Sequence, residues 1–413
     1  MTDWEKIEEK IIRKETEVVR RNAGRIPYTT ESPHRFDDHS TPDRISWWTN
    51  GFWGGICWQL YHATKEEFFR DQALFVEEKL DPVLLSYQGM DHDSGFRYLP
   101  TSVARCRLEH DPEALNRSLL AATNLTGRFN ANGNFIRAWN DWGDGRDTTG
   151  WAIIDCMMNL PLLYWASKEH DDPRFYAIAL AHARTAARHF IREDGSVRHI
   201  VGFDPQSGTF LREYGGQGMA DGSSWTRGQA WAVYGFSLSF LHTGEREFLE
   251  AARLVADRFL KRMPKEGLMP VDFDQRQDCP FHDSSAAAIA ASGLLTLAEL
   301  TEKPSPKLED SGLLIWAELS KDFPNLYAAS KYLSSAEAIG LAGGESERYR
   351  QGAEKLLSIL DGLDCDYDPD HDELIKSCSA SYHDEKHNFP IIYADYFYIE
   401  AILKLTGKAL FIW

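Results

Sequence analysis

Asp155 is the residue whose surroundings in the sequence are best suited to acid–base chemistry. It lies in the stretch 150–167, GWAIIDCMMNLPLLYWAS, which is apolar over most of its length. If this stretch is one helix, the positions at −4, +3 and +7 share the face of Asp155, and these are Trp151, Met158 and Leu162. Removing a carboxyl group from water raises its pKa, so Asp155 is a candidate general acid. The structural alternative is a buried Asp that bonds to Asn159 or caps a helix N-terminus.

Asp93 is a second carboxylate that could work with Asp155. It lies in the turn His92-Asp93-Ser94-Gly95-Phe96. Close to Asp155, its negative charge would raise the pKa of that residue, or it could bind a hydroxyl group of a ligand. The same spacing also fits an Asp that only caps a turn before Gly95.

Arg227 lies within an aromatic stretch, Trp225-Thr226-Arg227-Gly228-Gln229-Ala230-Trp231. A buried guanidinium needs a counter-charge, which is either an anionic ligand group or a structural carboxylate. Trp225 and Trp231 are either core residues or flat surfaces on which a ligand stacks. Several loops that precede apolar stretches are likewise rich in Trp, Gly and Asp, a composition typical of a sugar-binding cleft.

Helices are the elements that must position these loops. Four segments are apolar nearly all round and predict helices buried on every face: 150–167, 222–243, 282–300 and 388–405. The stretch after Pro173 is amphipathic instead, and Asp172-Pro173 is a typical helix start. Similar endings after the buried segments indicate a weak repeat of roughly 60–75 residues.

Alternating buried and amphipathic helices predict an all-α fold, an (α/α)6 barrel made of six helix hairpins. An open helical solenoid is the competing interpretation, but it would not need so many helices buried all round. No linker is evident, so we expect one catalytic domain over 1–413. The segment 302–344 fits poorly because it contains three prolines without a clear hairpin, and we expect an insertion or an irregular unit there.

Composition excludes several classes of function. The chain of 413 residues has a formal net charge of −18, which disfavours proteins that wrap nucleic acid or lie on anionic membranes. The six cysteines have no metal-binding spacing, and no apolar leader precedes the first helix, so we expect a cytoplasmic protein without metal or cofactor. Aromatic residues make up 12% of the chain, enough for both a packed core and an aromatic cleft.

Four motifs in order resemble the unsaturated glucuronyl hydrolases of glycoside hydrolase family 88. They are HDSGF at 92–96, IIDCMMNLPLLYWAS at 153–167, SSWTRGQAWAVYGF at 223–236 and HDSSAAAIAASGLL at 282–295. The resemblance implies an (α/α)6 barrel and an enzyme that acts on the oligosaccharides left by polysaccharide lyases. Such enzymes release the 4,5-unsaturated uronate from the non-reducing end by hydrating its C4=C5 double bond.

The resemblance also implies roles for particular residues. Asp155 matches the catalytic acid and base, and Asp93 matches a second essential Asp. The positions that match substrate contacts are Trp47, His92, Trp139, His199, Gln217, Arg227 and Trp231. Arg227 is the candidate partner of the uronate carboxylate. Gly216 stands where members that accept sulfated fragments resemble one another in an Arg, so the sequence predicts no strong preference for sulfated sugars.

Other functions remain open at this point. An unsaturated rhamnogalacturonyl hydrolase would share the barrel and the chemistry but act on pectin fragments. A sugar epimerase would need paired catalytic histidines on the inner helices. A non-catalytic barrel would only bind sugar. We expect an unsaturated oligosaccharide as the binding partner, and a monomer or a homodimer.

Overall fold

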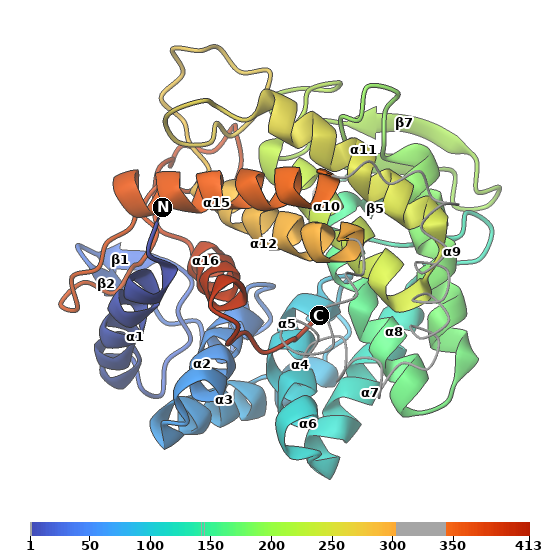
Figure 1. The fold of residues 1–413 in the computed structure, drawn as a ribbon. Helices are drawn as coiled ribbons and strands as arrows, with labels where there is room; N and C mark the ends of the chain where they lie inside the picture. The colour runs from blue at the N-terminus through green and yellow to red at the C-terminus, as the bar shows by residue number, and fades with distance from the viewer. Residues whose placement is uncertain (1, 142, 144, 303–343) are drawn as a thin grey trace.

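A computed structural model describes residues 2–141, 143, 145–302 and 344–413. Within these ranges, helices form two concentric rings (Figure 1). The inner ring consists of α2 (Asn50–Thr64), the broken unit α5 (Ser94–Tyr98)–η1 (Leu99–Val103)–α6 (Ala104–Glu109), α8 (Leu160–Glu169), α10 (Thr226–Thr243), α12 (Ser284–Thr301) and α16 (Ile392–Leu405). The outer ring consists of α1 (Trp4–Arg21), α3 (Glu67–Lys79), α7 (Pro112–Thr126), α9 (Pro173–His189), α11 (Arg246–Arg262) and α15 (Glu345–Leu363).

The inner ring is closed. Each inner unit contacts the next one along the chain, and α16 packs back against α2. In α10 every residue from Thr226 to Leu241 is buried, as is every residue of α16 from Ile392 to Leu403. The predicted (α/α)6 barrel is therefore confirmed, because an open solenoid would leave its first and last inner helices apart.

The outer helices follow their sequence signals. Asp172 accepts a hydrogen bond from the backbone N–H of Arg174 at the start of α9, and Asp111 caps α7 in the same way. Both helices have a proline in the first turn. The backbone N–H groups of a first turn have no partner within the helix, so the missing N–H of proline costs no hydrogen bond there. The amphipathic faces of these helices bury their apolar side against the inner ring.

The prediction of one helix over 150–167 was wrong. This stretch contains β5 (Trp151–Ile153), a 3-10 turn η2 (Ile154–Met158) and then α8, which begins at Leu160. Pro161 lies in the first turn of α8, and a proline fits there but not inside a helix. Asp155 consequently lies on the turn that leads into an inner helix, and Leu162 does not share a helical face with it.

The second inner unit is also interrupted. A short π-helical turn, η1, contains Pro100 and separates α5 from α6. At the start of this unit Gly95 packs on Asn159, since a Cβ added there would lie 2.5 Å from the Cα of Asn159. The close approach brings the turn before α5 against the turn before α8.

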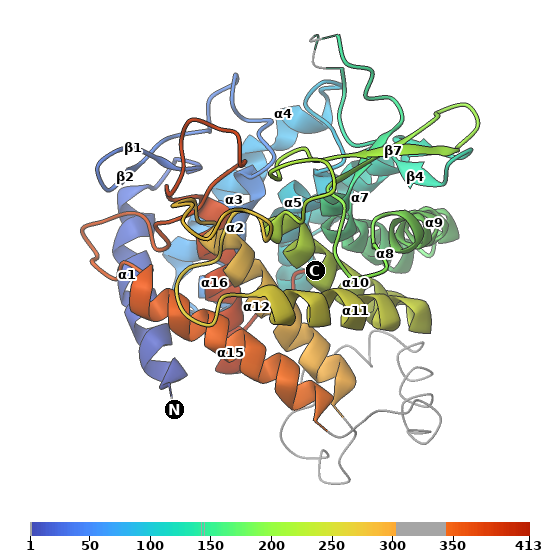
Figure 2. The same cartoon turned by 90° about the horizontal axis from the view of Figure 1, so that it is seen from above.

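Small antiparallel sheets gather at one end of the barrel (Figure 2). They are β1 (Thr30–Ser32) with β2 (Arg35–Phe36), β3 (Phe129–Asn130) with β4 (Phe135–Ile136), and a three-stranded sheet of β5, β6 (Ile200–Phe203) and β7 (Phe210–Tyr214). In the last sheet Ile153 pairs with Ile200, and Ile200 pairs with Tyr214. The short helix α4 (Asp81–Leu84) precedes the loop at 85–93.

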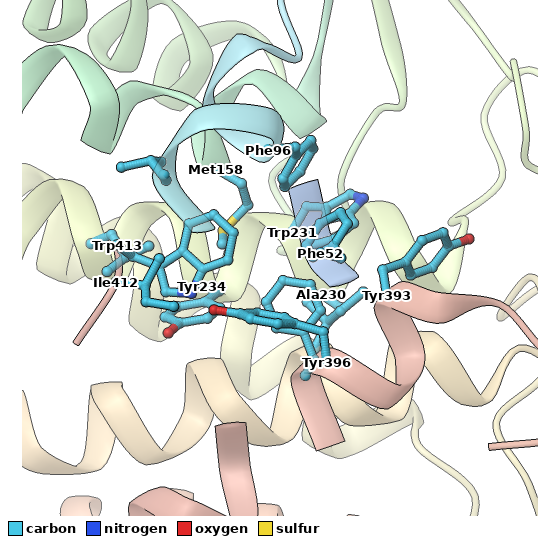
Figure 3. Close-up of a cluster of buried hydrophobic side chains, with 14 of the residues drawn as sticks. Phe52, Phe96, Met158, Ala230, Trp231, Tyr234, Tyr393, Tyr396, Ile412 and Trp413 are labelled. Atoms are coloured by element: carbon cyan, nitrogen blue, oxygen red, sulfur yellow. The ribbon is translucent and has the colours of Figure 1, made fainter. Parts of the chain in front are cut away.

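The centre of the barrel is filled by aromatic side chains (Figure 3). Trp413 stacks on Phe397 at 5.6 Å between ring centroids and also contacts Phe52 and Phe96. Its indole N–H donates to Oε1 of the buried Glu400 at 2.7 Å. Residues from both ends of the sequence thus share one core.

Most of 302–344 lies outside the described residues, so the expected irregular unit stays a prediction. By length and composition alone, helix α12 is long and apolar enough to cross a membrane. However, 94% of it is buried within the protein, as an inner helix of a barrel must be. The six cysteines are free thiols.

Candidate active site

A pocket of about 500 Å³ opens among the loops at the same end as the small sheets. Five of the residues predicted for the site line it: Trp47, Asp93, Trp139, His199 and Gln217. They come from loops before α2, α5, β5 and α10 and from the turn after α9, which are far apart in the sequence. The barrel therefore gathers at one opening these five residues, which were predicted from separate motifs.

Asp155 is buried next to this pocket, with 6% of its surface exposed. Its Oδ2 has no hydrogen-bond partner among the described residues and lies 3.8 Å from Nε2 of His199. Burial, together with the negative charge of Asp93, raises the pKa of Asp155 to about 7, against the opposing charges of His92 and Arg227. Asn159 donates to the backbone carbonyl of Asp155, not to its carboxylate, so the carboxyl group stays available for chemistry.

His92 is fully buried between two acceptors. Its Nδ1 lies 2.7 Å from the carbonyl oxygen of Ala138, and its Nε2 lies 3.1 Å from Oδ1 of Asp93. Burial opposes a charge on the ring, but the neighbouring Asp93 outweighs it and raises the pKa of His92. A ring that faces an acceptor on each side is best satisfied as an imidazolium, with one N–H directed to Ala138 and the other to Asp93.

The pKa of His199 is lowered, whereas that of His92 is raised. Its Nδ1 accepts a hydrogen bond from the backbone N–H of Gln217 at 2.9 Å, so the proton of the neutral ring is on Nε2, facing Asp155. Burial lowers the pKa of His199 to about 3, helped by the charges of Arg227 and His92. A neutral, fixed donor thus points toward the candidate acid.

Gly216 makes possible the hydrogen bond from the backbone N–H of Gln217 to Nδ1 of His199. Its φ of +58° is in the left-handed region, and a Cβ added there would overlap Nδ1 of His199. No side chain fits at this position with this backbone, which explains in physical terms why an Arg is absent before Gln217. The amide of Gln217 also donates to the carbonyl oxygen of Ala380 at 2.7 Å, which ties the loop to the segment before α16.

Arg227 and Trp231 are not among the residues that line the pocket. Arg227 is 1% exposed and forms an ion pair with Asp283, and its guanidinium also donates to the carbonyl oxygen of Ser379 at 2.7 Å. Asp283 is the structural carboxylate that the sequence left open as the alternative counter-charge. Trp231 is fully buried and packs on Phe96 at 5.1 Å, so it belongs to the core.

Several residues at the pocket were not predicted from the motifs, among them Gln88, Arg146 and Trp151. Gln88 lies in a loop without any sequence signal. Arg146 follows the motif Trp139-Asn140-Asp141-Trp142, and a loop that follows such a motif is a place to look for further contacts. Trp151 was predicted to lie beside Asp155 on a helix, but it reaches the pocket from β5.

Asp91, His92 and Asp93 lie close enough together to surround a metal ion. Asp91 and both ring nitrogens of His92, however, already have partners within the protein. Asp91 pairs with Arg97 at 2.9 Å and accepts the backbone N–H of Asp93, while His92 bridges Ala138 and Asp93. This set holds the turn in place and does not fit a metal site, which needs open lone pairs.

The pKa of Asp155 leads to a prediction about pH. As a general acid it must be protonated, so kcat/KM should fall about tenfold per pH unit above about pH 7. Replacing Asp93 by Asn removes a charge that raises this pKa, so the titration of Asp155 should move to lower pH. Carboxyl carbon NMR of Asp-labelled protein measures that shift without relying on activity. An unchanged midpoint in Asp93→Asn would contradict the coupling between the two carboxylates.

The chain is similar to known proteins over most of its length. A family model described as Glycosyl Hydrolase Family 88 matches residues 17–306. The unsaturated glucuronyl hydrolase of Bacillus sp. (strain GL1) is 38% identical over 285 residues, 68% of this chain and 74% of the relative. The unsaturated chondroitin disaccharide hydrolase of Streptococcus pneumoniae is 37% identical over 60% of this chain and 62% of its own length. The crystal structure of the Bacillus sp. GL1 enzyme, described as responsible for the degradation of glycosaminoglycan, matches with a TM-score of 0.81, 30% identity and 96% coverage of each chain.

Proposed function

The chain belongs to glycoside hydrolase family 88, and from this premise we propose that it releases a 4,5-unsaturated glucuronic acid from the non-reducing end of oligosaccharides made by lyases. We propose fragments of glycosaminoglycans or bacterial polysaccharides as its substrates. The observation that carries the proposal is a buried carboxyl group, Asp155, whose pKa is raised to about 7 beside an aromatic pocket. An acid of this kind can deliver a proton to carbon at neutral pH.

The proposed reaction begins at the enol ether of the unsaturated ring. Asp155 donates its proton to C4, and the positive charge that develops at C5 is shared with the ring oxygen. Water then adds to C5, and its proton passes to the Asp155 carboxylate, which restores the acid. The product is a hemiketal that opens and releases the rest of the sugar.

The neighbouring residues support these steps. Asp93, which is paired with His92, adds the negative charge that raises the pKa of Asp155, and it faces the pocket, where it can accept hydrogen bonds from ring hydroxyls. The neutral His199 lies 3.8 Å from Asp155 and can orient its carboxylate. Trp47 and Trp139 offer flat surfaces for the C–H face of the ring.

The test is a panel of unsaturated disaccharides monitored by the ultraviolet absorbance of the C4=C5 double bond. Loss of absorbance with glucuronyl substrates supports the proposal, and exclusive consumption of pectin-derived substrates would favour an unsaturated rhamnogalacturonyl hydrolase. Binding of every disaccharide without turnover would favour a sugar-binding barrel. Epimerisation of a saturated sugar would point to an epimerase instead.

Trp47 gives a second prediction on substrate binding. Its side chain is 42% exposed at the pocket and packs edge-on against Tyr28, so it is available for stacking. Trp47→Ala should lower kcat/KM about fivefold, mainly through KM, because a stacking contact contributes about 1 kcal/mol. Trp47→Phe keeps an aromatic face and should recover most of the loss. A change in kcat alone would contradict a role in binding.

We also propose a reducing compartment, the cytoplasm, for this protein. Its six cysteines are free thiols, and four of them are buried. Unpaired thiols in this number are typical of proteins that are kept reduced.

A further inference from the structure

A second cavity of about 500 Å³ lies beside the active-site pocket. Of the described residues, none lines both cavities, but the segments 84–93 and 137–151 contribute to each. We call it the second pocket. The residues of its lining that matter for its chemistry are Tyr87, Thr123, Asn124, Arg128, Arg137 and Thr149.

Arg128 and Arg137 give the second pocket its charge. Arg128 donates to the backbone carbonyl oxygens of Arg137, Met90 and Ala138 at 3.0–3.2 Å and to Oδ1 of Asn140 at 2.9 Å. Arg137 donates to Oγ1 of Thr148 at 3.2 Å, and its buried Nε has no partner within the part of the chain that the structure describes. Among the described residues, neither guanidinium forms an ion pair with a carboxylate, and no Asp or Glu lines the cavity.

Three other shielded arginines of this protein are paired with carboxylates. Arg97 lies 2.9 Å from Asp91, Arg105 lies 3.0 Å from Glu77, and Arg117 lies 2.6 Å from Asp81. Burial and the charge of Arg137 together lower the pKa of Arg128, although Asp91 opposes them. Two neighbouring cations that share one cavity without a paired carboxylate attract an anion from solution.

The remaining lining fits a sugar better than a bare ion. Thr123 and Thr149 bring hydroxyl groups to the cavity, and Asn124 brings an amide. At its rim the ring of Tyr87 is 76% exposed. A mixture of hydroxyl, amide and aromatic groups is typical of sites that hold sugar rings.

We propose that the second pocket binds an acidic group, a sulfate ester or a carboxylate, carried by a sugar. Arg137 supplies the charge, while Arg128 mainly holds the loops in place through its four hydrogen bonds. The site needs no turnover and is independent of the proposed hydration reaction. It would give the enzyme a contact with acidic oligosaccharides outside the catalytic pocket.

Calorimetric titration of the full chain tests this proposal. The probes are a saturated disaccharide with one sulfate ester, its counterpart with a carboxylate, the uncharged disaccharide and inorganic sulfate. Arg137→Gln should weaken binding of both acidic disaccharides at least about tenfold, the expected effect of losing a charged hydrogen bond. Arg137→Lys should weaken it less. Arg212→Gln is the matched control, because Arg212 is exposed and already paired with Asp221.

The outcomes separate the alternatives. Equal affinity of Arg137→Gln and the wild-type protein for the acidic disaccharides would overturn the proposal. Tight binding of inorganic sulfate with no binding of the acidic disaccharides would overturn the sugar part and leave a free-anion site. If Gln217→Ala, and not Arg137→Gln, removes the binding, the sugar occupies the active-site pocket and the proposal fails. Because the probes are saturated, failure of the hydration reaction would leave this result unaffected.

Discussion

Replacing Asp155 by Asn should lower kcat about a thousandfold and at the same time make the protein more stable above pH 7. Loss of activity follows because an amide cannot donate the proton that the C4 carbon requires, and general acids contribute about 10²- to 10⁴-fold. The ultraviolet assay measures kcat directly. Binding of substrate should persist, because the aromatic and polar lining of the pocket is unchanged.

The gain in stability follows from the raised pKa of Asp155. Its value is about 7 in the folded protein against 3.8 for an ordinary Asp. Between these two pH values the unfolded chain ionises this group while the folded protein does not, so folding loses stability as pH rises and the loss is complete above about pH 7. At about 1.36 kcal/mol per pH unit, the upper limit of this loss is about 4 kcal/mol. The amide of the Asp155→Asn variant does not titrate, so the variant should recover this free energy.

Thermal unfolding at pH 5 and pH 8 measures this effect. The increase in Tm of Asp155→Asn over the wild-type protein should be larger at pH 8 than at pH 5. Asp71→Asn, at an exposed position on α3, is the matched control and should change neither Tm nor kcat. An inactive variant with no gain in stability at pH 8 would separate catalysis from the raised pKa, and an active variant would refute the role of Asp155.

Replacing Arg227 by Met should destabilise the protein by about 3–5 kcal/mol. The change leaves the carboxylate of Asp283 buried without its counter-charge, and removing one partner of a buried ion pair has an effect of this size. The carbonyl oxygen of Ser379 also loses its hydrogen bond from Arg227, while that of Ala380 keeps only the one from Gln217. Denaturant unfolding measures the free energy of unfolding.

The double variant Arg227→Met with Asp283→Asn is the control for this prediction. Because the unpaired charge is then gone, it should be less destabilised than the sum of the single changes. A variant Arg227→Met that unfolds like the wild-type protein but has a raised KM would show that Arg227 holds the substrate carboxylate after all. Arg227→Lys keeps the charge but loses the planar fork, and an intermediate stability is expected.

The sequence predicted the barrel because burial of whole helices leaves a clear pattern. Helices α10, α12 and α16 begin two to four residues after the first residue of the corresponding predicted buried segment. They end within one residue of the last residue of that segment. The prediction of one helix over 150–167 was wrong because an apolar run does not distinguish a buried strand and turn from a buried helix. Pro161 carried the missing information, since it is compatible only with the first turn of a helix.

The candidate site was predictable only in part. The apolar surroundings of Asp155 were visible as neighbours in sequence, and its burial agrees with them although the local structure differs. The partner of Arg227 was not visible, because Asp283 is 56 residues further along the chain and any carboxylate could have met it. Contacts between loops of different hairpins, such as the bond from Gln217 to His199, depend on the closed ring and leave no local pattern.

Closure of the ring through α16 and α2 has a consequence for synthesis of the protein on the ribosome. Helix α2 ends at Thr64, whereas its inner neighbour α16 begins at Ile392. At about 5–20 residues per second, the ribosome needs roughly 16–66 s to make the intervening chain. During that interval the apolar face of α2 that later meets α16 has no permanent partner. Nascent chains halted before residue 392 should therefore bind chaperones, and release them once α16 and the following residues up to Trp413 emerge.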